Sequence, residues 1–186
     1  MKNLARIMVL SAALVTNAYA LEYNQVQPEA SEIRFSYNQM GVTMRGGFSR
    51  FTGELRFDPE QLEQAHVMID VDLDSIDTGI PEADTEVTKP IWLHTEAFPT
   101  ARFESHAVEA LDEQNYTVSG QLTIKGTTQE ISVPATFTAA NGLGVFTGAF
   151  SINRGDFAIG EGMWASFDMV ANAIDVQFQI TATVGD

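Results

Sequence analysis

Apolar and polar residues alternate along most of the chain, which is the pattern of β-strands with one buried face. In residues 120–137, Leu122 and Ile124 alternate with polar neighbours, and after a turn at 126–129 the segment 131–137 alternates in the same way. This pattern predicts a β-hairpin with one apolar face. The same alternation predicts further strands at residues 33–37, 67–73, 101–104, 116–124, 146–152 and 174–182, with one or two more in 42–57.

A few segments depart from simple alternation. Phe51 is out of phase with Phe48, so we expect a bulge or bend at residues 49–50. Residues 58–61 have the pattern of a one-turn helix start, with aspartate as the cap and proline at the first helical position. Residues 82–89 predict a short helix in the longest connection, and a proline follows them.

Strands with one apolar and one polar face form either a two-layer sandwich or a closed antiparallel barrel. Residues 115–125 would extend for about 35 Å as one strand, which is longer than the usual strand of about five or six residues. We therefore expect an all-β fold, an antiparallel eight-stranded barrel with one or two short helices in its connections.

Residues 1–20 have the composition of a secretory signal peptide. They begin with Lys2 and Arg6, continue with an apolar run from Ile7 to Val15, and end in Ala18-Tyr19-Ala20. A transmembrane anchor would need about 20 apolar residues, and this run is too short. We expect cleavage after Ala20, export, and one barrel domain over residues 21–186, with no later segment that spans a membrane.

The charge and the cysteine count exclude several classes of function. The formal net charge is −15, and removal of the two basic residues in 1–20 would make it −17. Nucleic acid is therefore excluded as a partner, because phosphate backbones require a basic surface. The sequence has no cysteine, which excludes disulfides and thiolate metal sites. Whether the chain forms a homodimer is left open by the sequence.

Motifs for catalysis or metal binding are weak. Asp70, Asp72 and Asp74 resemble the start of a calcium loop, but Ser75 and Pro81 stand where that loop requires glycine and glutamate. The three histidines lack metal-ligand spacing. The sequence contains no GxSxG elbow, no HExxH helix and no phosphate-binding loop. We expect neither an enzyme nor a metal site, and no cofactor.

Five short motifs extend over most of the chain after residue 20. They are Gly47-Phe48 with Phe51-x-Gly53, the segment SIDTG at 75–79, FPTARFES at 98–105, GQLTIKGTT at 120–128, and INRxDF at 152–157. With these motifs in this order the chain resembles the YceI-like family, with one departure at Ala158, where the family often has glycine. The resemblance implies a lipocalin-like barrel in the bacterial periplasm that binds polyisoprenoids or similar long-chain amphiphiles in its interior.

An eight-stranded barrel is filled by side chains or holds one small ligand. Small inward residues such as Ala101, Gly120 and Gly148 leave room, whereas phenylalanines from neighbouring strands could fill it. With the resemblance we expect a cavity that sequesters or transports a polyisoprenoid, an isoprenoid quinone or a prenyl phosphate. The alternatives are a fatty acid or fatty amide, or a filled barrel that acts as a structural or interaction protein. The expected lining is Phe35, Phe48, Phe103, Val118, Leu122, Ile124, Phe137, Phe146, Phe150, Trp164 and Phe178.

The alternation of inward and outward positions also predicts that two charged residues point inward. The row that contains Phe150 continues to Arg154, and the row that contains Val71 continues to Asp77. A charge in an apolar interior requires a partner. Arg154 therefore either pairs with Asp77 as a structural clasp or meets the head group of a ligand.

Overall fold

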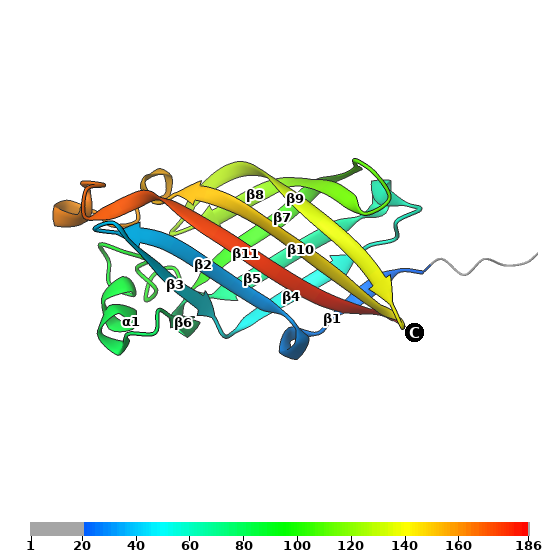
Figure 1. Ribbon diagram of the computed structural model, residues 1–186, viewed down its shortest axis with the longest axis horizontal. Coiled ribbons are helices and arrows are strands. Elements are labelled where there is room, and N and C mark those ends of the chain that lie inside the picture. The colour runs from blue at the N-terminus through cyan, green and yellow to red at the C-terminus, as the bar shows by residue number, and fades with distance from the viewer. Residues whose placement is uncertain (1–20, 186) are drawn as a thin grey trace, which may run out of the picture.

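The computed structural model describes residues 21–185, in which eleven strands form a single antiparallel sheet that curls into a barrel (Figure 1). The sheet order is β4-β5-β7-β8-β9-β10-β11-β2-β3-β6, and β1 pairs with the far part of β11. The strands are β1 (Tyr23–Val26), β2 (Glu32–Gln39), β3 (Val42–Phe48), β4 (Phe51–Arg56), β5 (His66–Asp72), β6 (Ile76–Asp77), β7 (Thr100–Ala110), β8 (Asn115–Ile124), β9 (Thr127–Ala140), β10 (Leu143–Asn153) and β11 (Val170–Val184).

The short strand β1 joins the two sides of the curled sheet. Tyr23 at its start exchanges two backbone hydrogen bonds with Phe57, which directly follows β4, at 2.8 and 3.0 Å. Because β1 also pairs with β11, it links β11 to the end of β4 at this end of the barrel. This arrangement leaves little strand edge unpaired there, as in closed antiparallel barrels.

The expected all-β barrel is confirmed, but the count of eight strands is not exact. Three of the long strands are interrupted: β1 and β2 by the 3₁₀ helix Pro28–Ala30, β3 and β4 at residues 49–50, and β5 and β6 by the 3₁₀ helix Leu73–Ser75. The expected bend at 49–50 is thus present. The bend at 49–50 leaves a phase break between Phe48 and Phe51, whereas alternation did not predict the interruptions at 28–30 and 73–75.

The connections carry one α-helix and five short 3₁₀ helices within the described residues. The expected helix at 82–89 is present as α1 (Pro81–Val87), with proline in its first turn. The expected helix start at 58–61 is instead a turn, in which an Asp58 carboxylate oxygen accepts a hydrogen bond from the Glu60 amide at 2.9 Å. The remaining 3₁₀ helices are Leu62–Gln64, Arg154–Phe157 and Gly162–Trp164.

Strand β7 contains a bulge at residues 105–107, where its register to β8 shifts. The bulge lets apolar side chains before and after it face the barrel interior. Opposite the bulge, a Cβ atom on Gly120 would lie 2.3 Å from the carbonyl oxygen of Glu104, so only glycine fits. Phe103 before the bulge and Val108 after it consequently both face inward.

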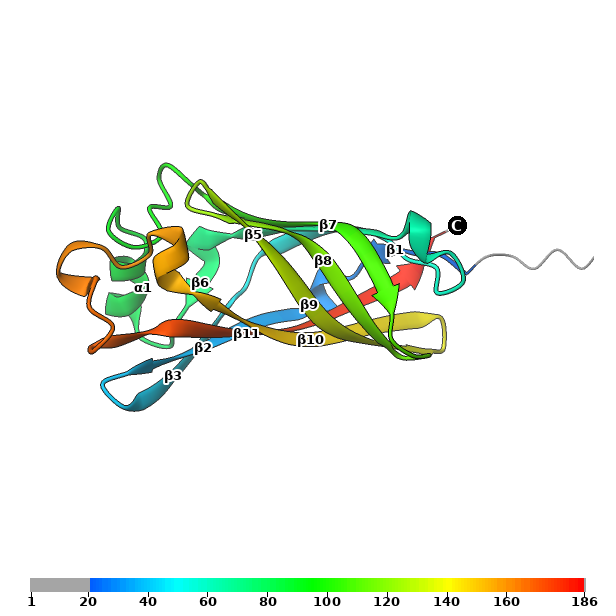
Figure 2. The same ribbon diagram turned by 90° about the horizontal axis from the view of Figure 1, so that it is seen from above.

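The two ends of the barrel differ. The α1 end, at the left of Figures 1 and 2, carries α1, the β2–β3 turn and the connection between β10 and β11. At the opposite end, near β1, five aromatic rings pack together: Tyr23, Phe57, Tyr116, Phe137 and Phe146. Ring-centroid distances in this aromatic cluster are 4.8 to 5.3 Å. These aromatic pairs close that end of the interior with dense packing.

Across residues 21–185, no helix is long and apolar enough to cross a membrane. The expected signal peptide at residues 1–20 lies outside the described residues, as does Asp186.

Candidate ligand-binding site

The barrel contains a cavity of about 730 Å³. Its wall is formed by residues of β1 to β11, with contributions from α1 and the segments that flank it. The volume lies within the range of about 300 to 1,000 Å³ that small-molecule sites occupy. Side chains therefore do not fill the interior. The alternative of a packed barrel, which required a filled interior, is wrong.

Ten of the eleven residues expected to line a cavity are on its wall: Phe35, Phe48, Phe103, Val118, Leu122, Ile124, Phe146, Phe150, Trp164 and Phe178. Most of them come from strands, where period-two alternation determines which side chains face inward. The same signal could have found further wall residues that were not singled out, among them Ile33, Tyr37, Leu55, Ile69, Ile152, Val176 and Ile180. Their role in binding a ligand remains a prediction.

Phe137 does not line the cavity, so its assignment to the wall is wrong. Its side chain is 7% exposed, and its ring packs against Tyr23, Phe57 and Phe146 in the aromatic cluster. Phe137 points inward as predicted, but it lies where the barrel is already closed. Alternation determines the direction of a side chain and not its height along the barrel.

Arg154 lies at the opposite end of the cavity and is only 1% exposed. All three of its guanidinium nitrogens donate hydrogen bonds to backbone carbonyl oxygens of the connection that follows β10 and of the first two residues of β11. Nε donates to Ala171 at 3.1 Å, Nη1 to Ile159 and Gly160 at 2.8 and 3.2 Å, and Nη2 to Trp164, Ser166 and Val170 at 2.8, 3.3 and 2.9 Å. The guanidinium thus holds residues 159–171 in one conformation.

Aromatic rings cover the Arg154 guanidinium on two sides. Its carbon atom lies 5.7 Å from the ring centre of Trp92 and 4.9 Å from that of Phe167. Trp92 in turn packs against Trp164, with ring centres 5.4 Å apart. Burial lowers the pKa of Arg154, because desolvation disfavours the charged form. Cation–π contacts and carbonyl oxygens compensate part of that desolvation.

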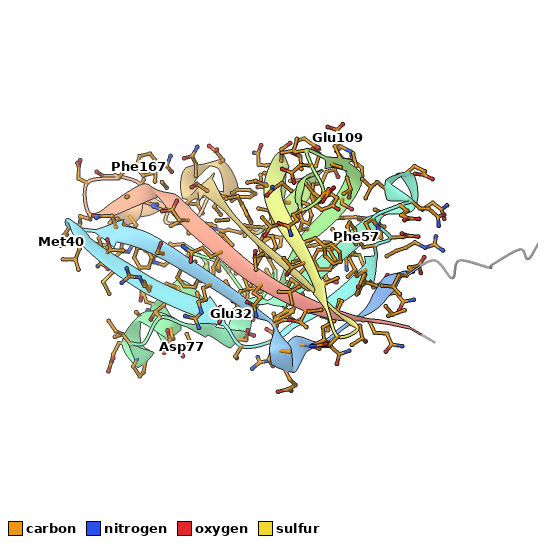
Figure 3. All side chains as sticks on the ribbon, turned by 45° about the vertical axis from the view of Figure 1, so that its right-hand side comes forward. Glu32, Met40, Phe57, Asp77, Glu109 and Phe167 are labelled. Atoms are coloured by element: carbon orange, nitrogen blue, oxygen red, sulfur yellow. The ribbon has the colours of Figure 1, made fainter. Side chains whose placement is uncertain are left out.

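Asp77 is not the partner of Arg154, and the expected ion pair is wrong. Asp77 is exposed, and its carboxylate accepts a hydrogen bond from the Gly79 amide at 2.8 Å. Figure 3 shows Asp77 and Phe167, which covers Arg154, on opposite sides of the α1 end. The 3₁₀ helix at 73–75 shifts the phase of the strand, so that Ile76 and Thr78 face the cavity while Asp77 faces outward.

Polar groups on the wall are few, and several gather at the α1 end. Glu82 and Glu86 line the cavity from one face of α1, together with Thr78 and Tyr37. The Glu86 carboxylate pairs with Lys89. Burial, and then the charge of Asp84, raise the pKa of the Tyr37 hydroxyl. Glu82 and Glu86 lie in a connection without strand alternation, so sequence periodicity carries no signal that they face the cavity.

The family model of the YceI-like domain matches residues 24–182 of this chain. The chain belongs to the YceI-like family. Relatives include a UPF0312 protein of Vibrio cholerae serotype O1, 28% identical over 139 residues that cover 74% of this chain and 72% of that protein. Another is a UPF0312 protein of Ectopseudomonas mendocina, 29% identical over 140 residues that cover 74% and 73%.

Solved structures share the fold. BcnA of Burkholderia cenocepacia superposes with a TM-score of 0.83 at 30% identity, covering 86% of this chain and all of BcnA. A protein described as a polyisoprenoid binding domain from Saccharophagus degradans superposes with a TM-score of 0.71 at 15% identity, covering 89% of this chain and 99% of that one. The second likeness shows the fold alone.

Trp92, on the cavity wall of this YceI-like protein, has a hydrogen-bond donor without a partner among the described residues. Trp92 is 8% exposed, and its indole Nε1 is buried without a hydrogen-bond partner among the described residues. A buried donor without a partner costs about 1 to 3 kcal/mol. Its ring contacts the Arg154 guanidinium and borders the cavity. Any movement that exposes this N–H group to the cavity therefore offers a donor to a bound molecule.

Proposed function

We propose that the protein binds one long apolar chain of the polyisoprenoid class inside the barrel and sequesters or carries it. The observation that supports this most directly is the cavity of about 730 Å³ with its wall of aliphatic and aromatic side chains. Each methylene group transferred from water to such an interior contributes about 0.8 kcal/mol. A chain of many carbon atoms would therefore bind through burial alone, without a specific polar contact.

Family and fold support a binding protein rather than an enzyme. The chain belongs to the YceI-like family, and a protein with the same fold is described as a polyisoprenoid binding domain. Arg154, a buried cation at the α1 end of the cavity, has its donors engaged by the backbone. The wall thus contributes shape and apolar surface, which suit containment of a ligand.

The proposal includes export to the periplasm, supported by the signal-like composition of residues 1–20. Expression of the full chain in a Gram-negative bacterium, followed by cell fractionation and intact-mass measurement, tests this part. We expect a periplasmic protein that begins at Leu21. A full-length protein that remains in the cytoplasm would contradict it.

The ligand is tested by organic extraction of the purified protein and mass spectrometry of the extract. We expect a co-purified lipid with a long isoprenoid chain. The delipidated protein should then take up a fluorescent polyisoprenoid analogue at one site per barrel. An extract without lipid, together with no uptake of isoprenoid or fatty-chain probes, would overturn the proposed function.

A further inference from the structure

The polar groups at the α1 end of the cavity influence which ligand end groups the protein can bind. Resting on the proposed function, we infer that the cavity selects apolar chains whose polar end is an uncharged hydrogen-bond acceptor, such as an amide, a carbonyl or an alcohol. Chains of the same length that end in phosphate or carboxylate are disfavoured. Three observations at the α1 end support this selectivity.

The first observation concerns Arg154, which is the one cation on the cavity wall at the α1 end among residues 21–185. Recognition of a phosphate or carboxylate by arginine requires free N–H groups in a forked arrangement. Each guanidinium nitrogen of Arg154 already donates to backbone carbonyls within residues 159–171, and two aromatic rings cover the group. An anion could gain these donors only by displacing that connection.

The second observation is the sign of the charge around the same end. Glu82 and Glu86 both line the cavity from α1, and Lys89 pairs with Glu86 alone. Among the described residues, no basic group forms a salt bridge with Glu82. Burial first, and then the charge of Asp84 in the same helix, raise the pKa of Tyr37, which lines the cavity at this end. An anionic end group placed here would be repelled, whereas an uncharged one would not.

The third observation is the indole N–H of Trp92, buried and without a partner at the same end. After a movement that exposes this group to the cavity, a ligand oxygen that accepts its hydrogen bond would remove the free-energy cost of an unpaired donor. Indole is a donor only, so the partner must be an acceptor. Among uncharged end groups, an amide, carbonyl or alcohol oxygen meets this requirement and a hydrocarbon end does not.

The opposite end of the cavity offers a weaker site for an anion. Arg56 and His66 border the cavity near the aromatic cluster, but they belong to the outward rows of β4 and β5, since Leu55 and Val67 face inward. The Arg56 guanidinium already pairs with Glu22 at 3.0 Å. The Arg56 guanidinium therefore presents its charge mainly to solvent.

The test compares end groups on identical chains. Delipidated protein is titrated with geranylgeraniol and geranylgeranyl monophosphate, and separately with oleamide and oleate, at neutral pH below the micelle-forming concentrations. We expect the alcohol and the amide to bind at least about 10-fold more tightly than the matched phosphate and carboxylate, a difference of about 1.4 kcal/mol.

Two variants assign the selectivity to these residues. The double variant Glu82→Gln/Glu86→Gln should reduce the ratio of the affinity for the alcohol to the affinity for the phosphate several-fold. The control Glu109→Gln/Glu113→Gln removes the same charge from exposed positions and should leave this ratio unchanged. Trp92→Phe should reduce the affinity for oleamide, relative to that for a hydrocarbon of equal length, by about fivefold or more.

The outcomes separate this inference from the proposed function. Binding of the anionic probes as tightly as the neutral ones, or more tightly, would overturn the inference and leave the proposed function intact. Equal effects of the two double variants would show that the selectivity reflects the overall charge and not the α1 end, which also overturns it. If no probe binds at all, the proposed function itself fails.

Discussion

The Nη2 atom of Arg154 donates a hydrogen bond of 2.9 Å to the carbonyl oxygen of Val170. Arg154 directly follows β10 and Val170 begins β11, so this contact joins the two strands at the α1 end of the barrel. With its other hydrogen bonds to residues 159–171, Arg154 organises a connection that has little regular structure of its own. We therefore expect substitution of Arg154 to reduce the stability of the fold more than it changes ligand binding directly.

The variant Arg154→Met should destabilise the ligand-free protein by about 3 to 5 kcal/mol, because several buried carbonyl oxygens lose their donor. Urea unfolding of the delipidated protein measures this change. Arg154→Lys should recover little, since an ammonium group cannot reach carbonyls on several sides. Arg34→Met, at an exposed ion pair with Glu32, is the matched control and should change stability by less than about 1 kcal/mol.

Asp77→Asn should leave the unfolding free energy nearly unchanged. The Asp77 carboxylate is exposed and accepts from the Gly79 amide, and an asparagine carbonyl oxygen can accept the same bond. Combined with Arg154→Met, its effect should be additive within about 0.5 kcal/mol. A loss as large as that of Arg154→Met, with strong coupling between the two, would restore the ion pair that the structure contradicts.

Leu122→Arg should abolish uptake of a polyisoprenoid probe, whereas Thr123→Arg should not. Leu122 lines the cavity, and Thr123 lies on the outer face, where its hydroxyl pairs with that of Thr128 at 2.8 Å. Neighbouring residues of a strand point to opposite faces, so the pair separates interior from exterior. Fluorescence titration measures uptake.

A buried arginine without a partner can prevent folding, so a second pair tests the same point with apolar side chains. Val118→Phe adds volume to the cavity and should lower probe affinity while the far-UV circular dichroism is retained. Thr117→Phe, the neighbouring residue of the same strand, should bind as the unaltered protein does. Equal losses from both variants would show that the ligand is not held inside the barrel.

Phe137→Ala should reduce stability by about 3 to 5 kcal/mol, because the ring is buried among Tyr23, Phe57 and Phe146. Phe103→Ala, on the half-buried cavity wall, should cost less stability and weaken ligand binding more. Denaturant unfolding and probe titration of both variants measure the two effects. The opposite order in either measurement would contradict the division between closed end and cavity wall.

Stability should fall as the pH rises above about 10, the ordinary pKa of tyrosine. Burial raises the pKa of Tyr23, Tyr37 and Tyr116 above 10.0, with the charge of Asp84 as a second cause at Tyr37 and that of Asp112 at Tyr116. Their neutral forms are favoured in the folded state, so the unfolded chain binds fewer protons in this range. Tyr37→Phe should reduce the pH slope of the unfolding free energy between pH 10 and 11, measured by urea titration.

Alternation along the sequence by itself determined the all-β class, the bend at 49–50 and most of the apolar wall. Leu122, Phe150 and Phe178 could be assigned to the interior because the direction of a strand side chain depends only on its parity. The same rule correctly continued the row of β10 to Arg154, which is buried. Local composition was also sufficient to predict a short helix at 82–89, which the structure contains as α1 with its start at Pro81.

The contacts of the charged residues and the extent of the cavity follow from the tertiary structure. Arg154 binds carbonyl oxygens that every residue carries, so no side-chain pattern could identify them. The 3₁₀ helix at 73–75 turned Asp77 outward, and the position of Phe137 near β1 placed it in the aromatic cluster. Glu82 and Glu86 reached the cavity through a connection whose path depends on packing between distant segments. Parity is a local property of a strand, whereas partners and depth follow from how the whole chain closes on itself.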